Sequence, residues 1–288
     1  MARVLAGGAA LGLVACLSSP SERKAAPSAS SRPQPAPGRA STPAQPGRKL
    51  ALELSGDNFE EAWKSVEAAL AESTAPIDSL DIDAFGAPFG DAGVRRLLEL
   101  QPHLAPLQLT LSNAKLTSAG LAMLLASDVP SRLTLLDLRD NLLGAPGARL
   151  LAESMRLASL RQLNLARNHL HTHGAAALAA ARSLSGLERL ELEYNFIGYN
   201  GARALTNSTA LPKLRDLGLA YNFLGDSGAQ FLAEKTWPTL ELLDVGSNEI
   251  GLPGARALAA KPFAPQAFIW FGNNLETAPL ERLKLQQR

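Results

Sequence analysis

The chain has 288 residues, 46% of them apolar, which suits one elongated domain with appended segments, and its single cysteine excludes an intrachain disulfide. The formal net charge of +1 hides an asymmetry: residues 18–49 carry six Lys or Arg against one acid, which leaves 21 basic and 26 acidic side chains in residues 50–288. A mildly acidic body argues against nucleic-acid binding, which needs a dense basic stripe.

The first fifteen residues have the pattern of a signal peptide. Arg3 precedes the apolar run Val4–Ala15, which is too short to span a membrane as a stable helix. The run ends in Leu13-Val14-Ala15-Cys16, which resembles the lipobox of bacterial lipoproteins. The resemblance implies that Cys16 is acylated and anchors the chain in the bacterial cell envelope, facing either the periplasm or the outside. Leu17, rather than Asp, after the cysteine favours the outer membrane. The alternative is an ordinary secretory signal, or a disordered start that contains an incidental cysteine.

Residues 16–48 are predicted to form a tether between the lipidated cysteine and the folded part of the chain. After Cys16 the segment consists mainly of Pro, Ala, Ser, Gly and Arg, and it carries too few aliphatic side chains to offset its conformational entropy, so we expect it to be disordered. At about 3 Å per residue, such a segment reaches up to roughly 90 Å from a membrane. Its basic side chains either rest on anionic lipid head groups or are incidental to a soluble spacer.

Residues 49–76 are expected to form an N-terminal cap of one strand and one helix. Leu50, Leu52 and Leu54 alternate as in a half-buried strand. A helix over Asn58–Ala71, with Asp57 or Asn58 as its N-cap, then places apolar side chains at helical spacing: Phe59, Trp63, Val66 and Leu70. A unit of this kind covers the exposed apolar layer of the first repeat in a solenoid.

Residues 77–276 repeat the pattern L-x-L-x-x-N-x-(L/I)-G-x-x-G-A-x-x-L, and residues 277–288 are left as a C-terminal cap or tail. The repeats register on asparagines spaced by 26 or 27 residues: Asn141, Asn168, Asn195, Asn222, Asn248 and Asn274. Two earlier copies are degenerate, with Ala114 and Phe85 at the asparagine position, and the first has extra residues in the loop Ala84–Phe89. The count is about eight repeats.

This pattern resembles the leucine-rich repeat family, in particular its ribonuclease-inhibitor-like class. The resemblance implies an α/β fold, a curved solenoid or horseshoe with parallel strands on the concave face and helices on the convex face. The alternating Leu side chains would point inward. The asparagines would form a ladder that satisfies backbone groups of the turning chain. Helices are expected over Gly147–Met155 and Gly201–Asn207, after a tight turn at the preceding glycine.

Residues between the inward Leu positions face solvent on the concave side and are the candidates for binding. We expect a protein partner, no nucleic acid and a monomeric chain. The candidate partner-binding residues are Glu191, Glu193, Tyr194, Tyr221, Trp270, Asp137, Arg139 and Asp244. Tyr194 and Tyr221 occupy the same position in adjacent repeats, about 5 Å apart, and exposed aromatics beside acids are typical of a binding hot spot. The alternative is that both tyrosines only pack, on each other and on Phe196 and Phe223.

The sequence offers only weak evidence for a metal site or a catalytic motif. His169, His171 and His173 alternate as metal ligands can, but no nearby Cys or Asp completes a shell, so no metal and no cofactor are expected. No hydrolase or phosphate-loop motif occurs, and nothing in the sequence indicates that burial shifts the pKa of Glu191 or Glu193. The favoured function is therefore a non-enzymatic, membrane-anchored lipoprotein. The alternative is a soluble cytosolic scaffold that regulates an enzyme such as a nuclease or small GTPase; a metal-dependent or hydrolytic activity is a third hypothesis.

Overall fold

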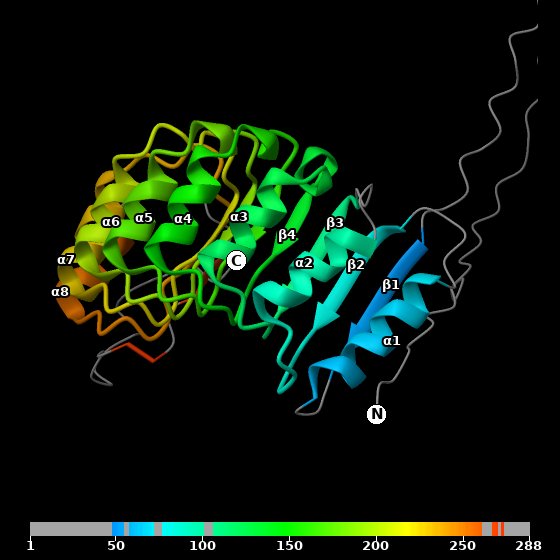
Figure 1. The fold of residues 1–288 in the computed structure, drawn as a ribbon. Helices are drawn as coiled ribbons and strands as arrows, with labels where there is room; N and C mark the ends of the chain where they lie inside the picture. The colour runs from blue at the N-terminus through cyan, green and yellow to red at the C-terminus, as the bar shows by residue number, and fades with distance from the viewer. Residues whose placement is uncertain are drawn as a thin grey trace, which may run out of the picture.

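A computed structural model describes residues 48–54, 58–71, 77–100, 106–260, 267–269 and 272–273, and it confirms the α/β solenoid. Nine parallel strands form one sheet in sequential order, and each neighbour along the chain is a neighbour in the sheet. The helices line the other face of this sheet and the whole stack bends into an arc (Figure 1). Cys16, Trp270 and Asn274 lie outside the described residues.

The strands are short and each is followed by a helix, except the last one described. The strands are β1 (Arg48–Glu53), β2 (Ile77–Asp83), β3 (Gln108–Ser112), β4 (Leu135–Asp137), β5 (Gln162–Asn164), β6 (Arg189–Glu191), β7 (Asp216–Gly218), β8 (Leu242–Asp244) and β9 (Ala267–Ile269). The α-helices are α1 (Phe59–Ala71), α2 (Gly90–Leu100), α3 (Ser118–Ala126), α4 (Gly144–Glu153), α5 (His171–Ala179), α6 (Gly198–Thr206), α7 (Gly225–Glu234) and α8 (Leu252–Ala259). Three 3₁₀ helices, η1 (Val129–Arg132), η2 (Met155–Leu157) and η3 (Arg182–Leu184), follow α3, α4 and α5. No helix in this described part of the chain has the length and apolarity to cross a membrane.

The core is a stack of identical leucine layers between the sheet and the helices. Pairing between strands aligns one leucine of each repeat with its counterpart in the next: Leu50, Leu80, Leu109, Leu136, Leu163, Leu190, Leu217 and Leu243. Every one of these side chains is at most 3% exposed. Because each repeat buries its apolar face only against its neighbours, stability is shared along the stack.

A buried asparagine ladder runs along the edge of the sheet where the strands end, which we call the turn edge. The Asn195 side chain is representative. Its Oδ1 accepts from the backbone N–H groups of Asn168 and Leu170 in the preceding repeat, at 3.0 and 3.2 Å. Its Nδ2 donates to the carbonyls of Leu165, Leu192 and Glu193. The asparagine thus pairs backbone groups that the turn leaves without ladder partners.

The last repeat corrects the sequence register by one residue. The ladder bonds there are made by Asn273, whose Oδ1 accepts from the backbone N–H of Asn248 at 2.7 Å, and not at the Asn274 position assigned from the sequence. In agreement, the partner of Asp244 in the sheet is Ile269, not Trp270. The argument that placed Trp270 on the concave face is therefore wrong.

The helices also begin earlier than expected. α4 and α6 start at Gly144 and Gly198, three residues before the predicted starts, and both end before the predicted ends. The expected tight turn at the glycine is confirmed, since Gly144 and Gly198 adopt left-handed conformations with φ values of 58° and 64°, and the helix follows directly from it. The equivalent position in α5 is His171, which adopts a φ of 55°.

The first strand and helix cover the end of the stack. Asn58 caps α1, since its Oδ1 accepts from the N–H of Glu60 at 3.0 Å, and the other candidate, Asp57, lies outside the described residues. The buried Trp63 ring lies below the guanidinium of Arg96, which is 5.1 Å from the ring centroid and forms ion pairs with Glu60 and Glu67 on α1. These contacts fix α1 against α2.

Candidate functional site

The concave face is built by the residues that alternate with the inward leucines. Strand pairing aligns one such residue from each repeat in a row across the sheet: Asp81, Thr110, Asp137, Asn164, Glu191, Gly218 and Asp244. The row two residues later includes Asp83, Arg139, Glu193 and Ala220. The sequence analysis anticipated this mixed, acid-rich face, and the structure brings five of its eight candidate residues onto these two rows: Asp137, Arg139, Glu191, Glu193 and Asp244.

Several of the acidic side chains on this face already accept hydrogen bonds from backbone N–H groups. Asp137 accepts from the N–H of Arg139 at 3.0 Å, and Asp244 accepts from the N–H of Gly246 at 2.8 Å. Burial raises the pKa of both carboxyl groups above the usual aspartate value. Arg139 lies beside Asp137, with a distance of 3.7 Å from its Nε to the Asp137 Oδ2. These residues therefore shape the face as much as they offer charge to a partner.

Glu191 and Glu193, here called the acidic pair, lean over Gly218 in the next repeat. A Cβ atom at Gly218 would lie 2.1 Å from Glu191 Oε2 and 2.2 Å from Glu193 Oε1, so only glycine leaves room for both carboxyl groups. Burial, and then the hydrogen bond and charge of Glu191, raise the pKa of Glu193 to about 8. The expectation that nothing shifts the pKa of this pair is wrong. The space beside Gly218 is thus occupied by the two carboxyl groups.

At the turn edge, three side chains from successive repeats form what we call the strand-end stack: Arg167, Tyr194 and Tyr221. The two tyrosine rings are nearly parallel, with centroids 4.0 Å apart and an interplanar angle of 10°. The Arg167 guanidinium lies over the other face of Tyr194, 3.8 Å from its centroid, and its Nε is 3.6 Å from Asp140 Oδ1. Stacked rings and a cation over a ring each contribute about 0.5–1.5 kcal/mol.

The outer end of the stack is open to solvent. Tyr221 is 45% exposed, and its hydrogen bond with Ser247 lowers the pKa of its hydroxyl, whereas the hydrogen bond with Tyr221 raises the pKa of Tyr194. The hydroxyls thus form a polar rim above two ordered apolar rings. Tyrosines held rigidly in this way are the side chains that dominate binding surfaces.

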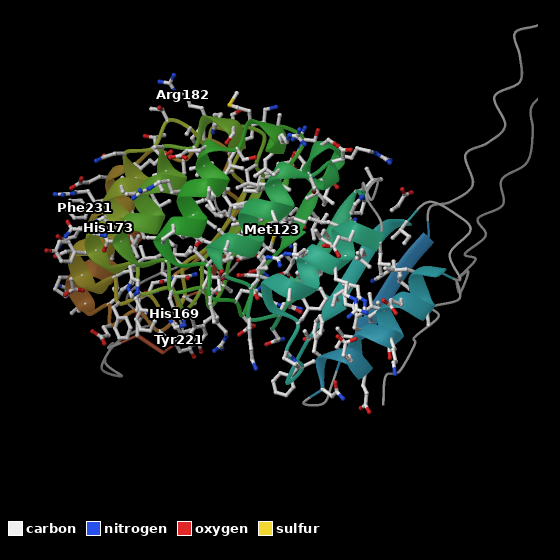
Figure 2. The ribbon with its side chains drawn as sticks, viewed as in Figure 1. Met123, His169, His173, Arg182, Tyr221 and Phe231 are labelled. Atoms are coloured by element: carbon white, nitrogen blue, oxygen red, sulfur yellow. The ribbon has the colours of Figure 1, made fainter. Side chains whose placement is uncertain are left out.

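A second aromatic stack lies in the turn itself, two residues further along each repeat. Phe196 stacks on Phe223 at 5.9 Å between centroids, and His169 and His171 stack on Phe196 at 5.8 and 5.6 Å. The tyrosines therefore pack on each other, and the phenylalanines form a stack of their own. Figure 2 shows His169 and Tyr221 at the turn edge, whereas His173 lies in the helix layer.

The three histidines do not lie along one extended segment. His171 and His173 belong to the first turn of α5, and the rings of His169 and His171 are both engaged with Phe196. Within the described ranges, no group of three or more His, Cys, Asp or Glu side chains is arranged to hold a metal ion.

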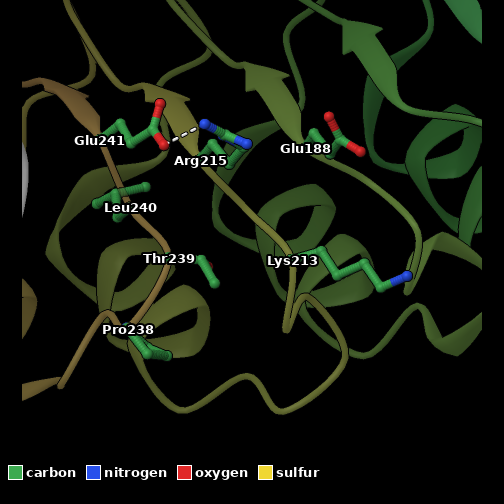
Figure 3. Close-up of a pocket in the computed structure, with 7 residues that line it drawn as sticks. All are labelled: Glu188, Lys213, Arg215, Pro238, Thr239, Leu240 and Glu241. Atoms are coloured by element: carbon green, nitrogen blue, oxygen red, sulfur yellow. Dashed lines mark hydrogen bonds and ion pairs between the residues drawn. The ribbon is translucent and has the colours of Figure 1, made fainter. Parts of the chain in front are cut away.

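The opposite edge of the sheet, where the strands begin, carries a separate hollow of about 460 Å³ (Figure 3). Its charged side chains pair between neighbouring repeats: Arg215 forms an ion pair with Glu241, and Glu188 lies 3.9 Å from the Nε of Arg161. Pro238, Thr239 and Leu240 complete its wall. Because Arg215, Glu241 and Glu188 already lie against neighbouring charges, this hollow is a weaker candidate for binding than the turn edge.

Comparison with known proteins agrees with this geometry. Residues 156–179, 210–233 and 238–259 match the family model described as Leucine Rich repeat. The chain contains leucine-rich repeats. No curated protein matches the chain. Among 93 similar chains of solved structures, one is the crystal structure of the LRR ectodomain of the plant membrane receptor kinase GASSHO1/SCHENGEN3 from Arabidopsis thaliana in complex with CASPARIAN STRIP INTEGRITY FACTOR 2.

That ectodomain is 20% identical in sequence, with a TM-score of 0.38, over 69% of this chain and 22% of the other. The chain therefore spans about a fifth of the length of its structural neighbour, and nothing about function follows from the likeness. What the leucine-rich repeats do establish is which positions are architectural. The leucines and asparagines build the solenoid, so chemistry specific to this chain lies in the variable residues of the concave face and turn edge.

Two members of the site were missed as candidates. Arg167 and Asp140 were read from the sequence as ordinary polar positions, but the structure places them in line with Tyr194 and Tyr221. The signal available in the sequence was positional, since all four residues directly precede the ladder asparagine of their repeats.

Proposed function

We propose that this chain is a non-enzymatic binding protein of the bacterial cell envelope, anchored through an acylated Cys16, that captures a protein partner with its concave face and turn edge. Leucine-rich-repeat solenoids present extended concave surfaces that suit macromolecular partners. The helix present in nearly every repeat, together with the 26- or 27-residue period, supports the ribonuclease-inhibitor-like class.

The observation that carries the binding proposal is the strand-end stack beside the acidic pair. Two tyrosine rings held at 4.0 Å, with Tyr221 45% exposed, lose little conformational freedom when a partner covers them. One step further into the face, Glu191 supplies negative charge beside the Glu193 carboxyl, whose raised pKa keeps it mostly protonated at neutral pH. The combination fits a partner that offers an apolar or planar group to the rings and a basic group to the carboxyls.

A non-enzymatic role is supported by the sequence and the comparisons together. The sequence contains no hydrolase, zincin or phosphate-loop motif. The family match is to a repeat that builds a scaffold. The one strongly perturbed carboxyl belongs to a pair whose shift follows from burial and mutual contact, as also occurs in binding surfaces.

The binding test compares partner capture, from native membranes by in situ crosslinking, between the unmodified chain and a Tyr194→Asn, Tyr221→Asn double variant. Asn tolerates the left-handed backbone of both positions, so the fold is kept while the rings are lost. We expect crosslinked partner to fall at least tenfold. The matched control is Tyr199→Asn, which removes an exposed tyrosine on α6 outside the stack. Equal capture by the double variant and the control would place the binding surface elsewhere.

The anchor is tested separately by metabolic labelling with a fatty acid. Label on the intact chain that disappears in Cys16→Ala supports the lipoprotein assignment, and an unlabelled chain in the soluble fraction supports the soluble scaffold instead. The two experiments are independent, because loss of the anchor leaves the concave face unchanged.

A further inference from the structure

A groove at the turn edge spans the first repeats of the solenoid. Its cavity volume is about 470 Å³, and it crosses the turns that follow β2, β3, β4, β5 and β6. Phe85, Leu142 and Phe196 line it, and these side chains are 76%, 53% and 46% exposed. Large apolar side chains left uncovered in one continuous groove indicate that something covers them.

The exposure of Phe85 has a local cause. Phe85 stands in register with the ladder asparagines, but the loop of its repeat is longer, and Ala84 and Ala87 fill the buried space instead. The ring is thereby expelled to the surface, where it forms the near wall of the groove. At the far wall, Phe196 and Tyr194 are held by the two aromatic stacks described above.

We propose that this groove is the docking site of the chain's own proline-rich segment, residues 32–37, with the sequence Arg-Pro-Gln-Pro-Ala-Pro. Alternating prolines favour the polyproline II conformation, and such segments bind grooves lined by aromatic side chains because they lose little entropy on docking. The inference does not depend on the lipid anchor or on the partner proposed above.

The dimensions of groove and segment agree. Five successive turns spaced by about 4.8 Å extend over about 19 Å. Six residues in the polyproline II conformation, at about 3.1 Å each, also extend over about 19 Å. The segment can therefore contact the whole series of turns from Phe85 to Phe196.

The connection is long enough. β1 starts at Arg48 on the far edge of the sheet, and its six residues place the turn edge about 20 Å away. The ten residues between Pro37 and Arg48 give eleven steps of about 3.1 Å, which span about 34 Å when extended. A connection of this length gives an effective concentration on the order of 1 mM at the groove.

Charge complementarity points the same way. Residues 18–49 carry six basic side chains and one acid, whereas residues 50–288 carry five more acids than bases. Within the groove Asp140 is offset by Lys115 and Arg167, so the contacts there are apolar and charge acts only between the whole tether and the whole body. A basic segment close to an acidic body is attracted to it even before specific contacts form.

With an effective concentration of about 1 mM and a site Kd of about 0.1 mM, roughly nine-tenths of molecules would be docked. The bond after Arg39 lies two residues beyond the docked segment, and a protease that cuts it must also bind the residues before it, including Pro37. Cleavage there would therefore proceed through the minor open form and be slowed about tenfold.

The test is limited proteolysis of the full chain with an arginine- and lysine-specific protease. We expect the bond after Arg39 to be cut about tenfold more slowly in the unmodified chain than in a Phe85→Ser, Leu142→Ser variant. The bond after Arg23 lies outside the docked segment and serves as the internal control, with equal rates in both. Because Phe85 and Leu142 are exposed, melting temperatures should agree and exclude misfolding of the variant.

Two further variants complete the design. Pro35→Ala with Pro37→Ala should raise the Arg39 rate to that of the groove variant, and combining the two sets should raise it no further. Pro33 is kept, because a following proline protects the bond after Arg32. Met155→Ser, which removes an exposed apolar side chain on the far side of the solenoid, should leave the rate unchanged.

Equal Arg39 rates in the unmodified, groove and proline variants would overturn the proposal. Slow cleavage that the proline variant relieves but the groove variant does not would also overturn it, because the segment would then dock elsewhere. Protection that strengthens with protein concentration would show that a second copy, not the same chain, fills the groove.

Discussion

Replacing Glu193 with Gln should stabilise the protein at neutral pH and remove a pH dependence that the acidic pair creates. The pKa of Glu193 is about 8 in the fold against 4.5 for an unperturbed carboxyl, because burial and Glu191 disfavour its ionised form. The folded chain therefore holds this proton more tightly than the unfolded chain. The stability that this proton contributes is fully present below about pH 4.5 and is lost as the pH rises towards 8.

The magnitude follows from the two pKa values. The unfolded-state pKa of 4.5 lies 2.5 units below pH 7, whereas the folded-state pKa of about 8 lies above it. At about 1.4 kcal/mol per pKa unit, keeping the proton at pH 7 costs the folded state roughly 3 kcal/mol of stability as an upper limit. Residual solvent contact at the edge of the face reduces this, so we expect Glu193→Gln to gain about 1–3 kcal/mol at pH 7. The gain should vanish near pH 4.5, where the native carboxyl is protonated in both states.

Urea unfolding at pH 4.5, 6, 7 and 8 and constant ionic strength measures the effect. Glu191→Gln should flatten the profile as well, since the hydrogen bond and charge of Glu191 are the causes that act on Glu193 after burial. The control is Glu188→Gln, an exposed carboxylate at the opposite edge of the sheet, whose profile should parallel that of the unmodified chain. The reasoning fails if the Glu193→Gln profile also runs parallel to it.

Three further substitutions test the architecture by the shift they cause in unfolding free energy. Asn195→Ala leaves two buried N–H groups and three carbonyls without its side chain and should cost about 3–5 kcal/mol, measured by urea unfolding. His171→Gly relieves a left-handed residue at a φ of 55° and should gain about 0.5–1 kcal/mol in thermal unfolding, less the lost contact with Phe196. Lys235→Met removes an Nζ that donates to two carbonyls and lies 4.2 Å from the Trp237 centroid, and should lower stability by about 1–2 kcal/mol.

The solenoid was predictable from sequence because its determinants repeat. The L-x-L spacing places two side chains of each strand on one face, and six copies in register leave little choice of fold. The pattern gave the wrong ladder asparagine in the last repeat. Asn273 and Asn274 are adjacent, and a period of 26 residues pointed to Asn274. The backbone selects the first, since Leu243 pairs with Phe268 and fixes the register one residue earlier.

The chemistry of the face was less predictable because it arises between repeats. Two carboxylates on one strand were visible in the sequence, but their burial depends on Gly218, which lies 27 residues after Glu191. The position of Arg167 over Tyr194 likewise depends on a side-chain rotamer, which no spacing encodes. Sequence periodicity therefore located the rows of the site, while contacts between neighbouring rows determined their electrostatics.

The backbone conformation of the stacked aromatics bears on whether they bind or merely pack. Tyr194, Phe196, Tyr221 and Phe223 all have a φ between 55° and 57°, a left-handed conformation that costs a bulky residue about 1 kcal/mol or more. Each stack returns about 0.5–1.5 kcal/mol, so stacking at best offsets this strain. Asn, which tolerates the same backbone, would serve the fold at least as well. Packing thus accounts for the order of the rings, and the exposed face of Tyr221 is the surface that we propose contacts a partner.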